Sequence, residues 1–101
     1  MYTVYLADDE QLIREGLAET IPWESLRMRL VGTAEDGRHA LRGIREHKPD
    51  IVLTDIRMPQ MTGLELIDEA KKIRKDIKSV IISGYGEFEL AKKALLLTLP
   101  D

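Results

Sequence analysis

A short apolar run that ends in one acidic residue, Ile51 to Asp55, constrains the fold of this chain more than any other feature. The four residues before Asp55 are apolar or β-branched, and no polar residue alternates with them. A run of this length and kind predicts a strand buried on both faces, as in a parallel sheet covered by helices. Ligands of such sheets bind outside the carboxyl ends of the strands. We therefore expect Asp55 at the functional edge of the domain.

Segments of strand and helix character alternate along the whole chain. Further strands are expected over residues 3–7, 30–34 and 79–82. Amphipathic helices are expected from residue 11, over residues 40–44, over residues 64–73 and over residues 88–97. Four consecutive strand–helix units predict a parallel sheet with right-handed crossovers and helices on both faces. The fold class is therefore α/β with a doubly wound parallel sheet.

Composition and charge exclude several classes of protein. The 101 residues fit one domain, and an apolar content of 44% with 33% charged residues argues against disorder. The net charge of −3 gives no electrostatic footprint for nucleic acid. No apolar run approaches the ~20 residues of a membrane span, the N-terminus lacks signal-peptide features, and the absence of cysteine excludes disulfides and thiolate metal sites. We expect a cytoplasmic protein that binds neither nucleic acid nor membranes through this segment.

Polar side chains follow three of the expected strands. Asp8, Asp9 and Glu10 follow the first strand, Asp55 ends the third and Ser83 follows the fourth. Parallel strands bring these ends to one edge, where clustered carboxylates repel one another unless a cation or a proton intervenes. Mg²⁺ suits such a site because it takes one or two carboxylates, keeps waters and completes its shell with phosphate oxygens. A serine hydroxyl at the same edge could hold a phosphoryl oxygen.

The order and spacing of four motifs resemble the receiver domain of two-component response regulators. The motifs are Asp8-Asp9-Glu10, Asp55, Met58-Pro59 with Gly63, and Ser83-Gly84-Tyr85, and they extend over essentially the whole chain. The resemblance implies a CheY-like, flavodoxin-type fold with strand order 2-1-3-4. Residues 21–24, 34–37 and 83–88 also resemble the subgroup whose receivers precede an AraC-type DNA-binding domain.

The family's site residues can be carried over position by position. The resemblance implies that Asp55 is the phosphoacceptor and takes a phosphoryl group from a sensor histidine kinase. Asp9 would bind Mg²⁺ directly, Asp8 mainly through water, and Arg57 through its backbone carbonyl. Asp55 would also belong to the Mg²⁺ site. Ser83 would bind a phosphoryl oxygen and move when Asp55 is modified. The residues with an implied loop or structural role are Pro59, Gly63 and Gly84.

The resemblance departs from the family pattern at the C-terminus. Family members continue into a fifth strand that ends in Lys-Pro and then a fifth helix, whereas this chain ends at Asp101. We therefore expect residues 1–101 to form a receiver domain without its final strand and helix. We also expect phosphorylation-driven switching to be weakened or absent, because the phosphate-binding lysine is missing. The fourth strand would be an edge strand beside an exposed face, which favours a homodimer or a swapped assembly. Residues 95–99 are expected to be poorly ordered, and DNA would be bound by a separate C-terminal domain.

The sequence leaves two other functions open. A Mg²⁺-dependent phosphatase could use Asp55 as its nucleophile, but residues 56–61 offer no second acid. A pseudo-receiver that binds partners without phosphorylation would explain the missing lysine, but not the intact acidic set. We favour a phosphoacceptor that is not an enzyme beyond slow self-dephosphorylation.

Overall fold

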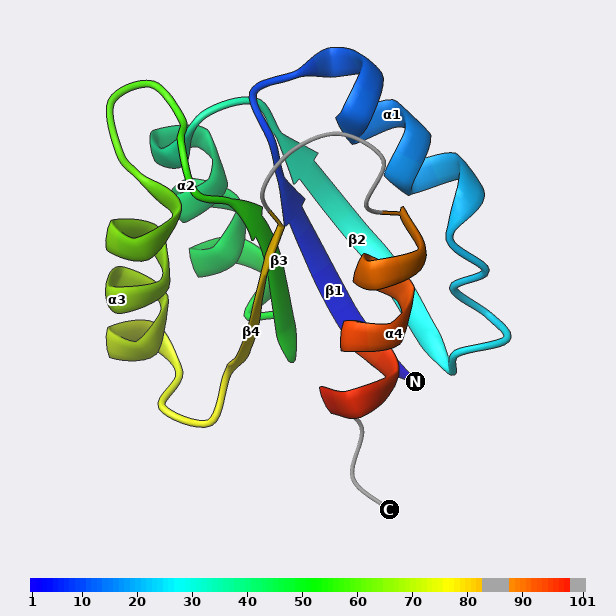
Figure 1. Cartoon of the computed structure of the whole chain (residues 1–101). Helices are drawn as coiled ribbons and strands as arrows, with labels where there is room; N and C mark the ends of the chain where they lie inside the picture. Colours follow the sequence, from blue (N-terminus) through cyan, green and yellow to red (C-terminus); the bar gives the residue numbers. More distant parts are fainter. Residues whose placement is uncertain (83–87, 99–101) are drawn as a thin grey trace.

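The computed structural model describes residues 1–82 and 88–98 and contains one four-stranded parallel sheet (Figure 1). Its strands are β1 (Tyr2–Ala7), β2 (Met28–Ala34), β3 (Ile51–Asp55) and β4 (Lys78–Ile82). The helices are α1 (Gln11–Thr20), α2 (Gly37–His47), α3 (Gly63–Ile73) and α4 (Phe88–Thr98). The strand order is β2-β1-β3-β4 and all three pairings are parallel. The predicted fold class, strand order and alternation of elements are confirmed.

The register of the sheet determines which strand ends meet. Ala7, the last residue of β1, pairs with Thr54, and Asp55 pairs with Ile82. The acidic turn after β1 therefore begins beside the end of β3. The residues of β3 from Ile51 to Thr54 are all buried, as the unbroken apolar run predicted for a strand covered on both faces.

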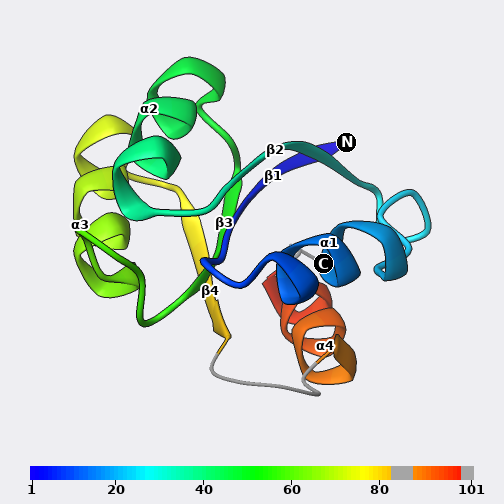
Figure 2. The same cartoon turned by 90° about the horizontal axis from the view of Figure 1, so that it is seen from above.

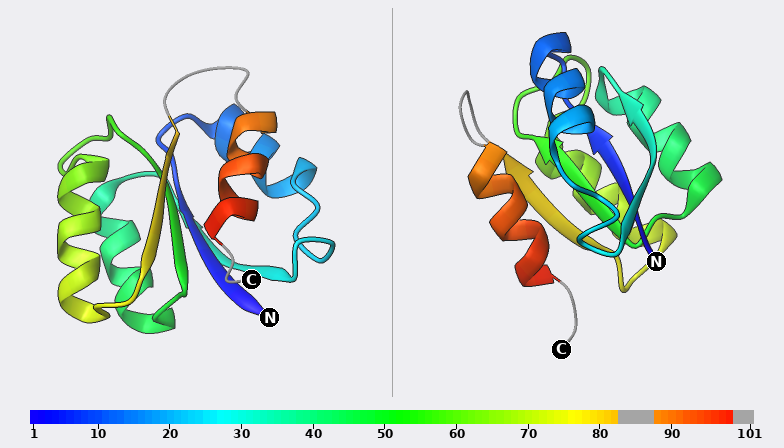
Figure 3. Two further views of the ribbon diagram at one scale, coloured as in Figure 1. Left: turned by 60° about the horizontal axis from the view of Figure 1, so that its bottom comes forward. Right: turned by 90° about the vertical axis from the view of Figure 1, so that its right-hand side faces the viewer.

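Helices cover both faces of the sheet (Figure 2). Helices α2 and α3 lie on one side, and α1 and α4 lie on the other, as the left view of Figure 3 also shows. The apolar cluster beneath α1 and α4 includes Leu6, Leu53 and Val80 from the strands. The cluster beneath α2 and α3 includes Val52 and Leu66. Successive residues of a strand therefore pack into two separate apolar clusters, one on each face of the sheet.

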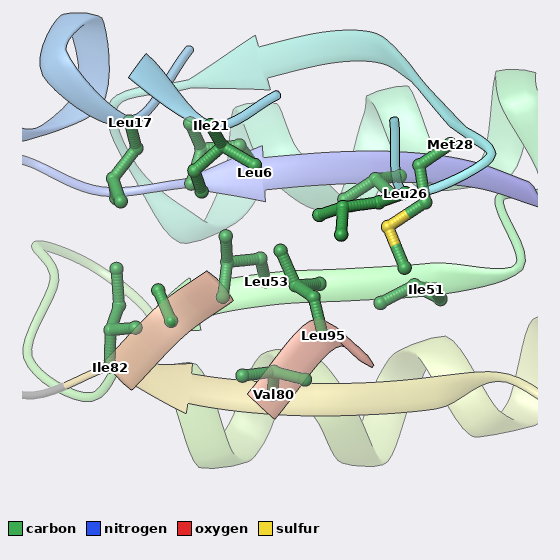
Figure 4. Packing of buried hydrophobic residues seen from close by; sticks show 12 residues of the cluster. Leu6, Leu17, Ile21, Leu26, Met28, Ile51, Leu53, Val80, Ile82 and Leu95 are labelled. Atoms are coloured by element: carbon green, nitrogen blue, oxygen red, sulfur yellow. The ribbon is translucent and has the colours of Figure 1, made fainter. Parts of the chain in front are cut away.

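Helix α4 corrects the expectation of an exposed face. It also includes residues 95–97 of the segment that was expected to be poorly ordered, whereas Leu99 of that segment lies outside the described residues. Ala91 and Leu95 are buried in the same cluster as Val80 and Ile82, so α4 covers the face that was predicted to lie open. Figure 4 shows Leu95 close to Leu53 and Val80. The physical reason is that Ala91 and Leu95, four residues apart, share one helix face, and burying that face removes apolar surface from water. β4 is an edge strand, and pairing with a second copy along it stays a prediction.

The helices differ in how their N-termini are held. Asp36 caps α2 by accepting the backbone N–H of His39, and Thr62 and Glu65 form a reciprocal capping box at α3. The residue at the cap position of α1 is Glu10, whose side chain makes no capping hydrogen bond. The start of α1 therefore depends on other contacts. None of the described helices is long and apolar enough to cross a membrane.

Candidate functional site

The carboxyl ends of β1 and β3 bring three aspartates together. Asp8, Asp9 and Asp55 each offer a carboxylate oxygen, and these oxygens lie within 4.8 Å of one another. Asp8 is buried, Asp55 is half-buried and Asp9 is exposed. The cluster is therefore open to solvent on the side of Asp9, and its deepest member is Asp8.

Asp8 is held at three points. Its backbone N–H donates to the carbonyl of Ala34 at 3.0 Å, and its Oδ1 accepts the backbone N–H of Glu10 at 2.9 Å. Its carbonyl oxygen accepts a hydrogen bond from the Arg14 guanidinium at 2.9 Å. Burial raises the pKa of Asp8 to about 6, and the nearby negative charges, that of Asp55 first, add to this although the Glu10 N–H opposes it. The site therefore carries negative charge at a real electrostatic cost.

Asp55 ends β3 with one oxygen already bonded. Its Oδ1 accepts the N–H of Ile56 at 2.7 Å. Burial raises the pKa of Asp55, and the charge of Asp9 raises it further against the opposing backbone N–H groups of Ile56 and Arg57. The backbone of the loop that follows β3 therefore holds one oxygen of this carboxylate.

The loop between β3 and α3 is packed directly against the backbone of Asp55. The Thr54 hydroxyl donates to the Asp55 carbonyl at 2.9 Å, and the Gly63 N–H donates to the Ile56 carbonyl at 2.7 Å. Pro59 accepts the backbone N–H of Met61 at 2.8 Å, which closes the turn inside the loop. The loop thus fixes the direction in which Asp55 leaves the strand.

Almost the whole chain matches one known protein family. Residues 4–100 match the model of the response regulator receiver domain. The chain belongs to the response regulator receiver family. This receiver is 45% identical over 95 residues to YesN, an uncharacterized transcriptional regulatory protein of Bacillus subtilis; the match covers 94% of this chain and 26% of YesN. The chain therefore spans about a quarter of the length of that relative.

Solved structures show the same fold. The receiver domain of AraT, a response regulator from Geobacillus stearothermophilus, superimposes with a TM-score of 0.79 at 39% identity, covering 99% of this chain and 78% of that one. A two-component transcriptional regulator AraC from Clostridium phytofermentans gives 0.76 at 37%, covering 89% and 73%. CheY from Borrelia burgdorferi, solved with CheX, BeF₃ and Mg²⁺, gives 0.72 at 26%, covering 96% and 71%. The resemblance to receivers of AraC-type regulators is borne out by these neighbours.

Most of the predicted site residues lie in the described part of the chain, and two of them do not. Asp8, Asp9 and Asp55 converge, and Pro59 and Gly63 lie in the loop that supports Asp55. The roles of the three aspartates as metal ligands, and of Asp55 as phosphoacceptor, stay predictions. The role of the Arg57 carbonyl as a ligand also stays a prediction. The predicted residues Ser83 and Gly84 lie outside the described part of the chain.

Sequence reasoning missed Arg14. No residue of the first helix was among the predicted site residues, yet Arg14 of that helix donates to the carbonyl of Asp8. The available signal was a cationic side chain one turn into the helix that follows an acidic turn.

A second group, Glu35, Asp36 and His39, also brings potential ligand atoms within 4.8 Å of one another. Both oxygens of Asp36 are bonded to His39, one to the backbone N–H and one to Nδ1. This arrangement caps the N-terminus of α2, and the capping role accounts for the closeness of Asp36 and His39 without a metal ion.

Proposed function

We propose that this receiver accepts a phosphoryl group on Asp55 from a sensor histidine kinase, with Mg²⁺ held beside it by Asp8 and Asp9. The observation that carries the proposal is the convergence of three carboxylates at the carboxyl ends of β1 and β3. CheY from Borrelia burgdorferi, a structural neighbour, was solved with BeF₃ and Mg²⁺, which supports the same chemistry here.

The residues present fit a hard divalent cation. All three donors are carboxylate oxygens, the ligands that Mg²⁺ prefers. The raised pKa values of Asp8 and Asp55 reflect burial and mutual repulsion, which a bound cation would relieve. Asp9 would bind the ion directly, Asp8 mainly through water, and the Arg57 carbonyl would add a ligand. The ion would neutralise charge on the transferred group.

Asp55 supplies the nucleophile in this proposal. Since Oδ1 accepts the Ile56 N–H, the other carboxylate oxygen attacks phosphorus. The new O–P bond forms as the P–N bond to the kinase histidine breaks, and the electron pair of that bond stays on the imidazole nitrogen. Such a transfer needs mainly in-line positioning and charge neutralisation. Ser83 would then bind a phosphoryl oxygen.

The response to phosphorylation would be carried out by another part of a longer protein. Because the chain spans only 26% of YesN, a transcriptional regulatory protein, we propose that the receiver works within a longer regulator with an AraC-type DNA-binding output domain. The phosphoryl transfer would take place in the cytoplasm. The receiver would not act as an enzyme beyond slow hydrolysis of its own acyl phosphate.

The test is incorporation of one phosphoryl group from acetyl phosphate, followed by intact-protein mass spectrometry. We expect an adduct only with Mg²⁺, and none in Asp55→Asn. The matched control is Asp68→Asn, which removes an exposed carboxylate of α3 and should leave the adduct unchanged. An unmodified parent protein would contradict the proposal. Phosphate-ester hydrolysis that survives Asp55→Asn would point instead to a different activity.

A further inference from the structure

Arg14 makes hydrogen bonds to the first and the last residue of the acidic turn, the segment from Asp8 to Glu10 that follows β1. Its guanidinium donates to the carbonyl of Asp8 at 2.9 Å, while its backbone N–H donates to the carbonyl of Glu10 at 2.9 Å. One residue of α1 therefore closes the segment that carries Asp8 and Asp9. The guanidinium binds a backbone carbonyl and takes up no carboxylate oxygen of the cluster.

Within residues 1–82 and 88–98, the acidic turn has few other restraints. Helix α1 begins without a side-chain cap, unlike α2 and α3. The Asp8 backbone N–H is tied to β2 through Ala34, and the Asp8 side chain holds the N–H of Glu10. If the Arg14 bond were lost, the Asp8 carbonyl would lose this side-chain anchor. Repulsion among the three carboxylates favours a wider spacing of the turn, so an anchor is needed to keep them close.

The charge of Arg14 is also well placed. The ion pairs among residues 1–82 and 88–98 join Asp36 to His39, Glu69 to Lys72, and Arg74 to two aspartates. None of these pairs includes a member of the acidic cluster. The guanidinium on the Asp8 carbonyl therefore brings positive charge to the turn without occupying a potential metal ligand.

We propose that Arg14 is a positioning residue for this site: it holds the β1–α1 turn in the conformation that gathers Asp8 and Asp9 beside Asp55 before a cation binds. The inference rests on the proposed function and adds a residue to it. A group that orients ligands in this way acts on cation affinity, because the protein otherwise has to order the ligands at the moment of binding.

The experiment compares Arg14→Met and Arg14→Lys with the parent, with Arg42→Met as the matched control. Arg42 lines the same hollow of ≈ 570 Å³ as Arg14 but is exposed on α2. Calorimetry would measure Mg²⁺ affinity, and hydrogen exchange without Mg²⁺ would report on the Glu10 amide. Acetyl phosphate would then give the phosphorylation rate at saturating Mg²⁺.

In Arg14→Met we expect Mg²⁺ affinity to fall about tenfold, the low end for an outer-sphere residue. Exchange of the Glu10 amide should accelerate, whereas the phosphorylation rate at saturating Mg²⁺ should stay within about twofold, since the loss is one of binding. Arg14→Lys keeps a donor and should recover most of the affinity. Arg42→Met should match the parent. If Arg14→Met does not fold, Arg14→Gln, which is too short to reach the carbonyl, replaces it.

Two outcomes separate this inference from the proposed function. A parent that takes up phosphate with Mg²⁺, together with an Arg14→Met variant of unchanged Mg²⁺ affinity, overturns the inference and leaves the function intact. A parent that neither binds Mg²⁺ nor becomes phosphorylated overturns the function, and the inference with it. If Arg14→Lys loses as much affinity as Arg14→Met, the hydrogen bond is not the cause and the inference fails.

Discussion

Gly63, the first residue of α3, lies against the carbonyl oxygen of Asp55 so closely that a side chain at this position would overlap it. The atoms in the way belong to the backbone of Asp55 and Ile56, which cannot rotate aside as a flexible side chain could. Glycine at position 63 is therefore a steric requirement of the candidate site. Its N–H also holds the loop by donating to Ile56.

Gly63→Ala should lower the free energy of unfolding by roughly 1–3 kcal/mol, because the methyl group forces the loop away from Asp55. Urea denaturation would measure the loss. Gly16→Ala in the middle of α1 is the matched control and should be neutral or stabilising, since alanine is the better helix former. Equal stability of Gly63→Ala and the parent would show that the loop has a second conformation available.

The ring of Tyr5 packs against two glycines, Gly32 and Gly43. We therefore expect substitutions at Tyr5 and at a glycine to have non-additive effects on stability. A Cβ at Gly32 would lie 2.6 Å from Cε2 of Tyr5, and a Cβ at Gly43 would overlap the tip of the same ring. Tyr5 is only 5% exposed and its hydroxyl donates to the carbonyl of Thr33 at 3.3 Å, so turning the ring away from Gly43 would break this hydrogen bond. Gly43→Ala alone should destabilise by roughly 1–3 kcal/mol.

In the double variant Tyr5→Leu/Gly43→Ala, the smaller side chain removes the overlap. The two losses should therefore be less than additive, with a coupling of about 1 kcal/mol or more in a double-mutant cycle followed by urea denaturation. Simple additivity would mean that α2 moves away from the sheet without strain.

Asp8 predicts a pH dependence of stability with a definite sign. Its pKa is about 6 in the folded chain against an ordinary value of 3.8, so the folded state binds more protons between these values. The free energy of unfolding contributed by Asp8 therefore falls as pH rises from about 4 to about 6 and stays low above that.

Asp8→Asn should consequently stabilise the protein at pH 7 without Mg²⁺ by about 1–2 kcal/mol, and by much less near pH 4. Urea denaturation of variant and parent at both pH values checks this. Added Mg²⁺ should raise the stability of the parent more than that of Asp8→Asn. A variant less stable than the parent at pH 7 in EDTA would show that the Asp8 carboxylate is not strained.

The position of α4 can be tested with two leucines of that helix. Leu95 is fully buried against the sheet, whereas Leu97 is 86% exposed. Leu95→Ala should cost about 2–5 kcal/mol because it leaves a cavity between α4 and the strands. Leu97→Ala should change stability by no more than about 0.5 kcal/mol. Thermal or urea unfolding of the pair would distinguish a docked α4 from an undocked one, for which both substitutions would be mild.

Much of the fold was predictable because the local signals agreed with one another. The unbroken run from Ile51 to Thr54 indicated a strand covered on both faces, and the four strand–helix alternations indicated a parallel sheet. Parallel topology then placed Asp8, Asp9 and Asp55 at one edge, and the structure gathers their oxygens within 4.8 Å. The strand order itself came from the family resemblance, because the alternation alone does not specify the order of strands.

Local patterns along the chain were enough to specify the elements, the parallel sheet and the edge at which the carboxylates meet, since periodicity and chain direction are local properties. The remaining features depend on how the segments pack together. The face covered by α4 depends on what Leu95 can bury, the need for Gly63 depends on the backbone of Asp55 beside it, and the link from Arg14 to Asp8 depends on how α1 leaves the strand. Each is a contact between segments whose relative placement follows from packing, which no local pattern encodes.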